Sequence, residues 1–232
     1  MKVLGDMDLG GCAVQSQDLF QGLDALKGFE ADHGIPFLCA NLRDAEGNLL
    51  FPAYRVMDFG GKKVGVLAVT DPKMQHAMKN MPEGLEFGDP MPALQEGVKA
   101  LREQEACDAV ILLYGGRREQ AIKSCDEVEG LDLIFFGNAT ISQRVAAETE
   151  IGTPVFSAAN RGKDFGEIVL TIKDEGGTEL SPILIHELDK SYDDHTEVKK
   201  LVDAFQAEAA ERKQRAQLIE KLAKEYSETS VK

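Results

Sequence analysis

Short apolar runs, separated by glycine turns and by segments with helical spacing, dominate the first 190 residues. The clearest unit spans residues 109–140, in which the apolar run 109–113 is followed by Gly115-Gly116, a helical segment (about 117–128) and a second apolar run (131–136). Apolar runs of this length without alternating polar positions are typical of strands that are covered on both faces. The pattern therefore predicts a βαβ unit with parallel strands, which is the building block of an α/β domain.

The flanking sequence predicts further strands and helices. Residues 2–4 have the pattern of a strand end that runs into a loop, and further strands are expected at 35–40, 62–70 and 154–158. A hairpin turn is expected at 58–61, and two antiparallel strands, 166–173 and 182–188, are expected to pair across the turn 174–177. Helices are expected at residues 17–30, 93–104 and 142–149.

A long helix is predicted from residue 194 to about 226, with Asp194 or Thr196 as its N-cap. At 1.5 Å per residue it measures roughly 45 Å, which is longer than the body of a small domain. Its second half is expected either to pack on another subunit or to remain a solvated helix that frays. The chain is therefore divided into residues 1–190 and 191–232, and the candidate partner-binding residues are Phe205, Ile219, Leu222 and Tyr226.

The charge of the chain excludes several classes of partner. Its 232 residues carry a formal charge of −14, whereas nucleic acids and anionic membranes require a basic face. No apolar run approaches the 18 residues that a membrane span needs, and no secretory segment follows Met1. A cytoplasmic location is expected if Met1 is the native start. A periplasmic or extracellular location is expected if the chain is a fragment of an exported protein.

Residues that commonly carry chemistry are scarce where an α/β sheet places its active site, at the carboxyl ends of the parallel strands. These ends are Tyr114-Gly115-Gly116-Arg117 and residues 137–141, and they contain no histidine, cysteine or carboxylate. The four cysteines form no C-x-x-C pair, and no two of the four histidines have metal-ligand spacing. The sequence therefore predicts no cofactor and no metal site.

Six segments, in order, resemble the metallophosphoesterase domain of the 5′-nucleotidase family. Residues 34–41 (GIPFLCAN) are similar to a strand of that family that ends in Ala-Asn, and residues 54–70 are similar to its gG-kVGv hairpin. Residues 107–113 and 130–137 resemble the strands before its Ser-His and Gly-His-Thr-His motifs. Residues 152–158 and 162–166 resemble the segment that closes the domain.

The resemblance implies a four-layer α/β/β/α sandwich of two mixed sheets, here incomplete at the N-terminus, and a two-metal centre for phosphate-ester hydrolysis. Two metals need a dense set of His, Asp and Asn ligands. Where the family has Gly-Asn-His-Asp/Glu, this chain has Gly5-Asp6-Met7-Asp8, and Tyr114-Gly115 replaces Ser-His. The resemblance thus implies a degenerate former site without catalytic residues or metal ligands, made of Asp6, Met7, Asp8, Gly115, Asn138, Ala139 and Ile141.

Three functions are compatible with these residues. The first is a non-catalytic domain that acts as a structural, assembly or binding subunit, with another protein or a second copy bound through the C-terminal helix. The second is a module for a small anion such as phosphate or a nucleotide, bound by Gly115, Gly116, Arg117 and Arg118. The third is a divergent phosphoesterase whose ligands come from an absent N-terminal segment or from a partner chain.

Overall fold

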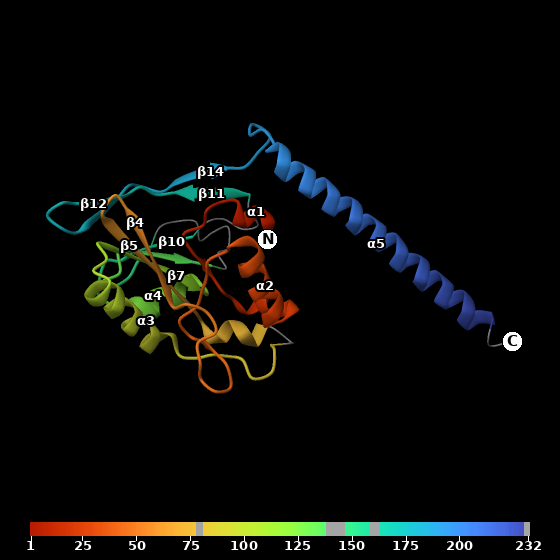
Figure 1. Cartoon of the computed structure of the whole chain (residues 1–232), viewed down its shortest axis with the longest axis horizontal. Helices are drawn as coiled ribbons and strands as arrows, with labels where there is room; N and C mark the ends of the chain where they lie inside the picture. The colour runs from red at the N-terminus through yellow and green to blue at the C-terminus, as the bar shows by residue number, and fades with distance from the viewer. Residues whose placement is uncertain (78–80, 138–146, 158–162, 230–232) are drawn as a thin grey trace. The chain divides into compact units, whose positions relative to one another are not determined.

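The computed structural model describes residues 1–77, 81–137, 147–157 and 163–229. A six-stranded sheet forms its centre (Figure 1), and only the two edge strands run antiparallel to their neighbours. The order across the sheet is β4 (Tyr54–Phe59), β5 (Lys62–Thr70), β7 (Ala109–Gly115), β8 (Leu133–Phe136), β10 (Pro154–Phe156) and β9 (Ala147–Glu148). With α4 (Arg118–Cys125) between them, β7 and β8 form the predicted βαβ unit.

A second, smaller sheet packs on one face of the six-stranded sheet. It consists of the parallel strands β1 (Cys12–Ala13) and β2 (Phe37–Leu38), which contact β5 and β7. Apolar side chains from both sheets fill the space between them: Ala13, Leu38, Val66, Ala68, Ile111 and Leu113. Alternation along β5 and β7 explains this arrangement, because successive side chains of a strand point to opposite faces.

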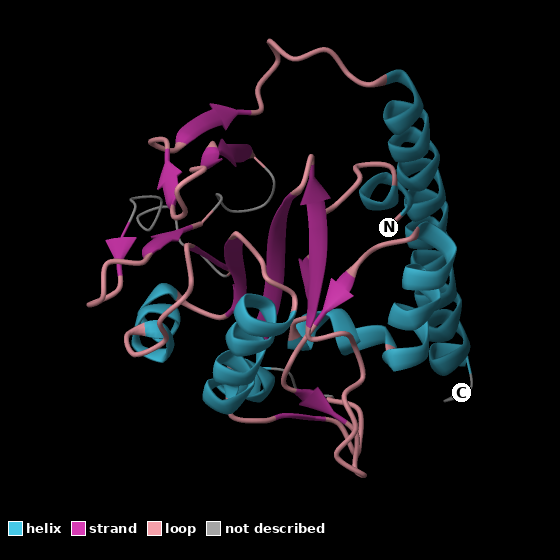
Figure 2. Cartoon of the chain, turned by 60° about the vertical axis from the view of Figure 1, so that its left-hand side comes forward, coloured by secondary structure: helices cyan, strands magenta, loops and turns pink. Residues whose placement is uncertain are grey.

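Helices cover the outer faces of both sheets (Figure 2). On the six-stranded sheet lie α4 and α3 (Pro90–Lys99), and α3 continues as a π-helical turn (Ala100–Gln104). Helix α3 approaches β5 closely, because a β-carbon on Gly97 would lie 2.6 Å from Leu67 Cδ1. On the small sheet lie a 3-10 helix (Ser16–Gln21) and α2 (Leu23–His33). The predicted α/β/β/α order is confirmed, with one sheet reduced to two described strands.

The N-terminal elements differ from two predictions. Residues 2–4 form a short helix, α1 (Lys2–Gly5), and not the end of a strand, because the N–H groups of Gly5 and Asp6 donate to the carbonyls of Met1 and Lys2. The helix predicted at residues 17–30 is divided in two at Gly22, whose φ of +93° lies outside the helical region.

The segment after β8 also departs from prediction at one point. Residues 147–148 form β9 and not the end of a helix, because they pair with β10. Residues 142–146 of that predicted helix lie outside the described residues. The antiparallel pairing predicted downstream, of 166–173 with 182–188, is confirmed in part. Strand β14 (Leu184–Glu187) pairs with β11 (Asp164–Glu167), whereas β12 (Leu170–Ile172) pairs across the predicted turn with β13 (Thr178–Leu180), which was not predicted as a strand.

Two short elements complete the α/β body, and a long helix follows it. The strands β3 (Leu42–Arg43) and β6 (Glu86–Phe87) form an antiparallel pair, and a 3-10 helix (Pro72–Ala77) follows β5. The chain separates into two compact units, Met1–Leu188 and Asp189–Lys232, and the second contains the predicted long helix, α5 (Thr196–Thr229). None of the described helices is long and apolar enough to cross a bilayer.

Candidate functional site

The carboxyl ends of the parallel strands meet at one edge of the six-stranded sheet. The register pairs Thr70, the last residue of β5, with Gly115, the last residue of β7. The end of β1 reaches the same edge, because the Thr70 hydroxyl donates to the Val14 carbonyl at 2.6 Å. We call this region the carboxyl edge and define it by Val14, Gln15, Thr70, Gly115 and Gly137. It is the place where an α/β fold collects its functional residues.

Asn41, which follows β2, ties this edge together. Its side-chain oxygen accepts the N–H of Thr70 at 2.9 Å, and its side-chain nitrogen donates to the carbonyls of Thr70 (2.7 Å) and Gly88 (2.8 Å). Asn41 is 2% exposed and Thr70 is fully buried. The Asn41 amide is therefore hydrogen-bonded to three backbone groups. It holds the loop after β2 and the loop at Gly88 against the end of β5.

Gln15 fills the middle of the carboxyl edge. A β-carbon on Gly115 would lie 3.2 Å from Gln15 Cγ, and one on Gly137 would lie 2.8 Å from Gln15 Nε2. The Gln15 side chain therefore lies against both glycines, with its Cγ methylene at Gly115 and its neutral amide at Gly137. Its neighbour Ser16 is buried and donates to the carbonyl of Met74 at 3.0 Å. Neither side chain brings a negative charge or an imidazole to this position.

One buried carboxylate, that of Asp71, lies next to the carboxyl edge. Asp71 is 6% exposed, its N–H donates to the Gly115 carbonyl at 3.0 Å, and its Oδ1 accepts the N–H of Lys73 at 2.9 Å. A β-carbon on Gly116 would lie 3.1 Å from Asp71 Cβ. This negative charge stands beside the segment that sequence analysis proposed for anion binding.

The predicted anion-binding residues form only part of such a site. Gly115 and Gly116 are buried, and the N–H of Gly116 already donates to the Tyr114 carbonyl at 3.0 Å. Arg117 is exposed and precedes the first turn of α4, and Arg118 is half-buried. An anion at this turn would therefore meet at least one occupied N–H and the buried carboxylate of Asp71.

Of the predicted former-site residues, the structure describes Asp6, Met7, Asp8 and Gly115. Asp6, Met7 and Asp8 are exposed. The segment from Gly11 to Val14 runs from Val66 toward Thr70, so residues 6–8 enter at the end of β1 that is opposite to Gly115. Asn138, Ala139 and Ile141 lie outside the described residues.

Four residues that meet at or beside this edge were not among the predicted site residues. They are Gln15, Asn41, Thr70 and Asp71. Gln15 was hidden because β1 has only two residues and follows Gly10-Gly11, which indicate a loop. Asn41, Thr70 and Asp71 were placed correctly at strand ends, and only their contacts were unknown.

Three ionisable side chains near this edge, those of Cys12, Cys39 and Tyr114, have pKa values raised by burial. Burial raises the pKa of the Cys12 and Cys39 thiols to about 11, which is the opposite of what a thiolate nucleophile needs. Burial also raises the pKa of Tyr114 to about 12, and its hydroxyl points to Ser124 of α4 at 3.2 Å. None of these three side chains is therefore prepared to act as a nucleophile at neutral pH.

The residues present do not fit a two-metal centre. Within the described part of the chain, no three His, Cys, Asp or Glu side chains come together as a metal-binding group. The side chain of His76 lies outside the described part of the chain. His186 lies on a late strand, where it stacks on Phe165 and contacts Glu167 at 3.0 Å. Two divalent ions need a far denser set of ligands.

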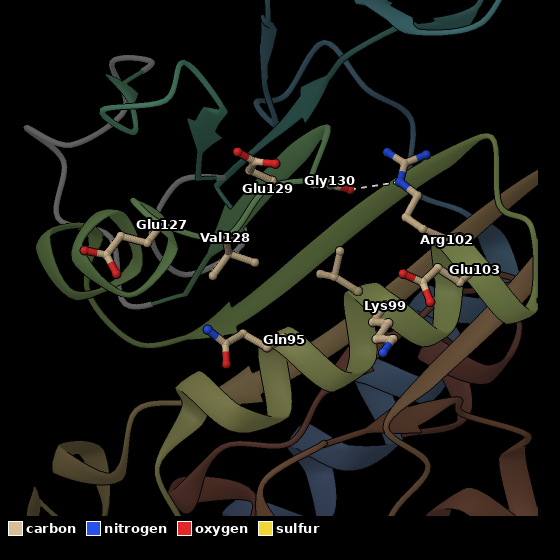
Figure 3. Close-up of a pocket in the computed structure, with 9 residues that line it drawn as sticks. Gln95, Lys99, Arg102, Glu103, Glu127, Val128, Glu129 and Gly130 are labelled. Carbon is tan, nitrogen blue, oxygen red and sulfur yellow. Dashed lines mark hydrogen bonds between the residues drawn. The ribbon is translucent and has the colours of Figure 1, made fainter.

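A separate pocket of about 650 Å³ lies between α3 and the segment after α4 (Figure 3). Arg102 lines it and donates to the carbonyls of Gly130, Cys107 and Asp108 at 2.9–3.0 Å and to the carboxylate of Asp132. These partners precede β7 and β8, so the pocket lies toward the amino ends of the strands. The guanidinium is used to join the starts of two strands, and the other charges around the pocket are mixed.

The predicted partner-binding residues lie on α5. Phe205 and Ile219 are exposed by 71% and 60%. Leu222 and Tyr226 belong to the same helix, and their side chains lie outside the described part of the chain.

Comparisons with known proteins identify the fold. No family model matches the chain. The trifunctional nucleotide phosphoesterase protein YfkN of Bacillus subtilis is 25% identical over 160 residues, which are 67% of this chain and 11% of that protein. A Staphylococcus aureus protein described as a 5′-nucleotidase, solved with alpha-ketoglutarate, superposes with a TM-score of 0.71 at 17% identity, over 88% of this chain and 43% of that one.

A crystal structure described as the calcineurin-like phosphoesterase YfkN superposes with a TM-score of 0.64 at 20% identity. The superposed region covers 84% of this chain and 68% of that one. The chain thus spans about a tenth of its curated relative and less than half of the Staphylococcus aureus protein. These likenesses show that the chain shares the fold of metallophosphoesterase domains of the 5′-nucleotidase type.

Proposed function

We propose that this metallophosphoesterase domain of the 5′-nucleotidase type does not hydrolyse phosphate esters and acts as a structural, assembly or binding subunit. The observation that carries the proposal is the position of Gln15. Its side chain lies against the glycines that end β7 and follow β8, with the methylene at Gly115 and the amide at Gly137, at the edge where this kind of fold collects its functional residues. A neutral amide at that point neither balances the charge of two divalent ions nor activates a water molecule.

The other polar groups of the carboxyl edge support the same proposal. The Asn41 amide and the Thr70 hydroxyl are hydrogen-bonded to backbone groups of neighbouring segments. Asp71 is the buried carboxylate described beside this edge, and one of its oxygens caps the turn at Lys73. These contacts stabilise the fold, and they leave few oxygen or nitrogen atoms that could bind a metal ion.

A hydrolysis assay tests the proposal. The purified chain is incubated with bis(p-nitrophenyl) phosphate and with nucleoside monophosphates, in Mn²⁺, Zn²⁺ or Fe²⁺, and the matching domain of YfkN serves as the positive control. We expect a rate equal to that of the metal and buffer alone. Turnover that depends on the metal and is abolished by Asp71→Asn would overturn the proposal, because it would place catalysis at this edge.

A divergent phosphoesterase completed by further residues is the second candidate. The observation that favours it is the greater length of the matched relatives, of which this chain covers 11% and 43%. In that case the chain alone would be inactive, and activity would appear when the missing segment or partner is added. Mixing the chain with extract fractions from its source, followed by the same assay, distinguishes the two candidates.

Binding of a small anion has weaker support in the geometry. The Gly116 N–H is occupied, and Asp71 places a negative charge beside the turn. We expect phosphate and adenosine monophosphate to leave the melting temperature unchanged. A shift that disappears in Arg117→Ala, and persists in Lys123→Ala on the last turn of α4, would support anion binding instead.

A further inference from the structure

Helix α5 carries an exposed apolar stripe. Its members follow one another at alternating spacings of four and three residues, and Arg212 is the single charged member. They are Val198, Val202, Phe205, Ala209, Arg212, Ala216 and Ile219. Positions with this spacing lie along one side of a helix and match the seam of a coiled coil. Phe205 and Ile219 are largely exposed, and Val202 is 44% exposed. We therefore expect the apolar stripe to be buried against another surface.

The charges of α5 are unevenly distributed along its length. Residues 196–211 contain four acidic and two basic residues, a net charge of −2. Residues 212–226 contain five basic and two acidic residues, a net charge of +3. A second copy of α5 is therefore complementary in charge when it runs in the opposite direction, and repulsive when it runs in the same direction.

We propose that α5 pairs with the α5 of a second copy of this chain in an antiparallel coiled coil. The apolar stripe supplies the buried seam, and the charges of the two halves select the direction. This pairing names the partner of the assembly role proposed above, and it rests on that role for its biological meaning, whereas its physical basis lies in α5 alone.

The middle of the helix is compatible with the pairing. Arg212 interrupts the apolar stripe, but its guanidinium donates to Glu208 of the same helix at 2.7 Å, so its charge already has a partner. Ala209 and Ala216 stand on either side of it, and small side chains allow two helices to approach closely where they cross. An antiparallel pair centred near Arg212 places each Phe205 close to the opposite Ile219.

Light scattering after size-exclusion chromatography, over roughly 1–100 µM of the full chain, tests the pairing. These concentrations cover the micromolar dissociation constants expected of a short coiled coil. We expect a mass of twice the 25.3 kDa of one chain. The double variant Phe205→Glu, Ile219→Glu should be monomeric, with the dissociation constant raised on the order of 100-fold or more. Leu218→Glu is the matched control, because Leu218 is equally apolar and 57% exposed but lies off the stripe.

Charge reversal tests the direction at low salt. Lys213→Glu with Arg215→Glu makes both halves acidic, so an antiparallel dimer should weaken by about tenfold or more. Adding Asp203→Lys and Glu211→Lys should restore it, because the first half becomes basic while Glu208 remains to pair with Arg212. A parallel dimer would respond in the opposite way to the first pair of changes, and circular dichroism would show that each variant remains helical.

The outcomes of the two proposals are distinguishable. A wild-type chain that is monomeric throughout this range, or a dimer that survives Phe205→Glu with Ile219→Glu, overturns the pairing and leaves the hydrolysis assay unaffected. A dimer that hydrolyses phosphate esters through Asp71 overturns only the proposed loss of activity.

Discussion

Replacing Asn41 with alanine tests whether the polar groups of the carboxyl edge are structural. The change removes three hydrogen bonds and leaves the N–H and carbonyl of Thr70, which is fully buried, without their side-chain partner. Each buried group left unsatisfied costs roughly 1–3 kcal/mol, so Asn41→Ala should lower the free energy of unfolding by about 3–5 kcal/mol. That loss is a large fraction of the stability of a typical domain.

Urea unfolding with linear extrapolation measures this loss. Near-UV circular dichroism of the tyrosines is the suitable signal, because the chain has no tryptophan and the 34 residues of α5 dominate the far-UV spectrum. Asn48→Ala is the control, since the Asn48 side chain donates to Asp44 at 3.1 Å in an exposed turn and its removal should cost less than about 1 kcal/mol. A loss below about 1 kcal/mol for Asn41→Ala would refute the structural role of its amide.

Three further predictions concern the packing at Gly115, the pH dependence of stability, and the hydrogen bonds of Arg102 at the starts of β7 and β8. Gly115→Ala should lower the free energy of unfolding by about 1–3 kcal/mol in the same urea assay, because the added β-carbon overlaps the Thr70 hydroxyl; an unchanged midpoint would contradict the close approach. Burial raises the pKa of Cys39 from 9.0 to about 11 and that of Cys125 to about 12, so these thiols ionise at a lower pH in the unfolded chain than in the folded chain. Their contribution to the free energy of unfolding is therefore complete below pH 9, and the free energy of unfolding should fall as the pH rises toward 11. A constant value from pH 8 to pH 11 would argue against buried thiols. Arg102→Ala should cost about 2–4 kcal/mol by urea unfolding, because it frees three backbone carbonyls and a carboxylate, and Arg102→Lys should recover only part of the loss.

The central part of the fold was predictable from the sequence because its signals are local. The runs that became β5, β7 and β8 are apolar on both faces, and glycine turns mark their ends. The hairpin between β4 and β5 also carries its turn residues in the chain itself, at Asp58, Gly60 and Gly61. Periodicity and turn chemistry therefore sufficed to place α3 and the strands of the six-stranded sheet other than β9, which was predicted as the end of a helix.

The N-terminal part was not predictable because its short elements depend on tertiary contacts. A segment as short as Lys2-Val3-Leu4 fits a strand or a helix equally well, and α1 packs on α2 in the folded chain. Strand β1 has two residues, and its pairing with β2 is what identifies Cys12 as the start of a strand. The residues assigned to the former site by motif order, Asp6 to Asp8, precede this strand, and their assignment stays a prediction.

The sequence shows which residue types lie at the carboxyl edge, but it does not show which side chains contact one another there. The absence of histidine and carboxylate at residues 114–117 and 137–141 can be seen in the sequence. That Gln15 meets Gly115 and Gly137, and that Asn41 holds Thr70, depends on contacts between residues 29 to 122 positions apart. No local pattern encodes such contacts, and only the assembled sheet reveals them.

Metal stoichiometry is the most direct test of the proposed loss of the two-metal centre. The purified chain is dialysed against Mn²⁺, Zn²⁺ or Fe²⁺, freed of excess ion and analysed by inductively coupled plasma mass spectrometry, with the matching domain of YfkN treated in parallel. We predict far less than one ion per chain, because neutral Gln15 and the backbone-bonded Asn41 and Thr70 occupy the carboxyl edge. Two ions per chain, lost in Asp71→Asn, would contradict that prediction.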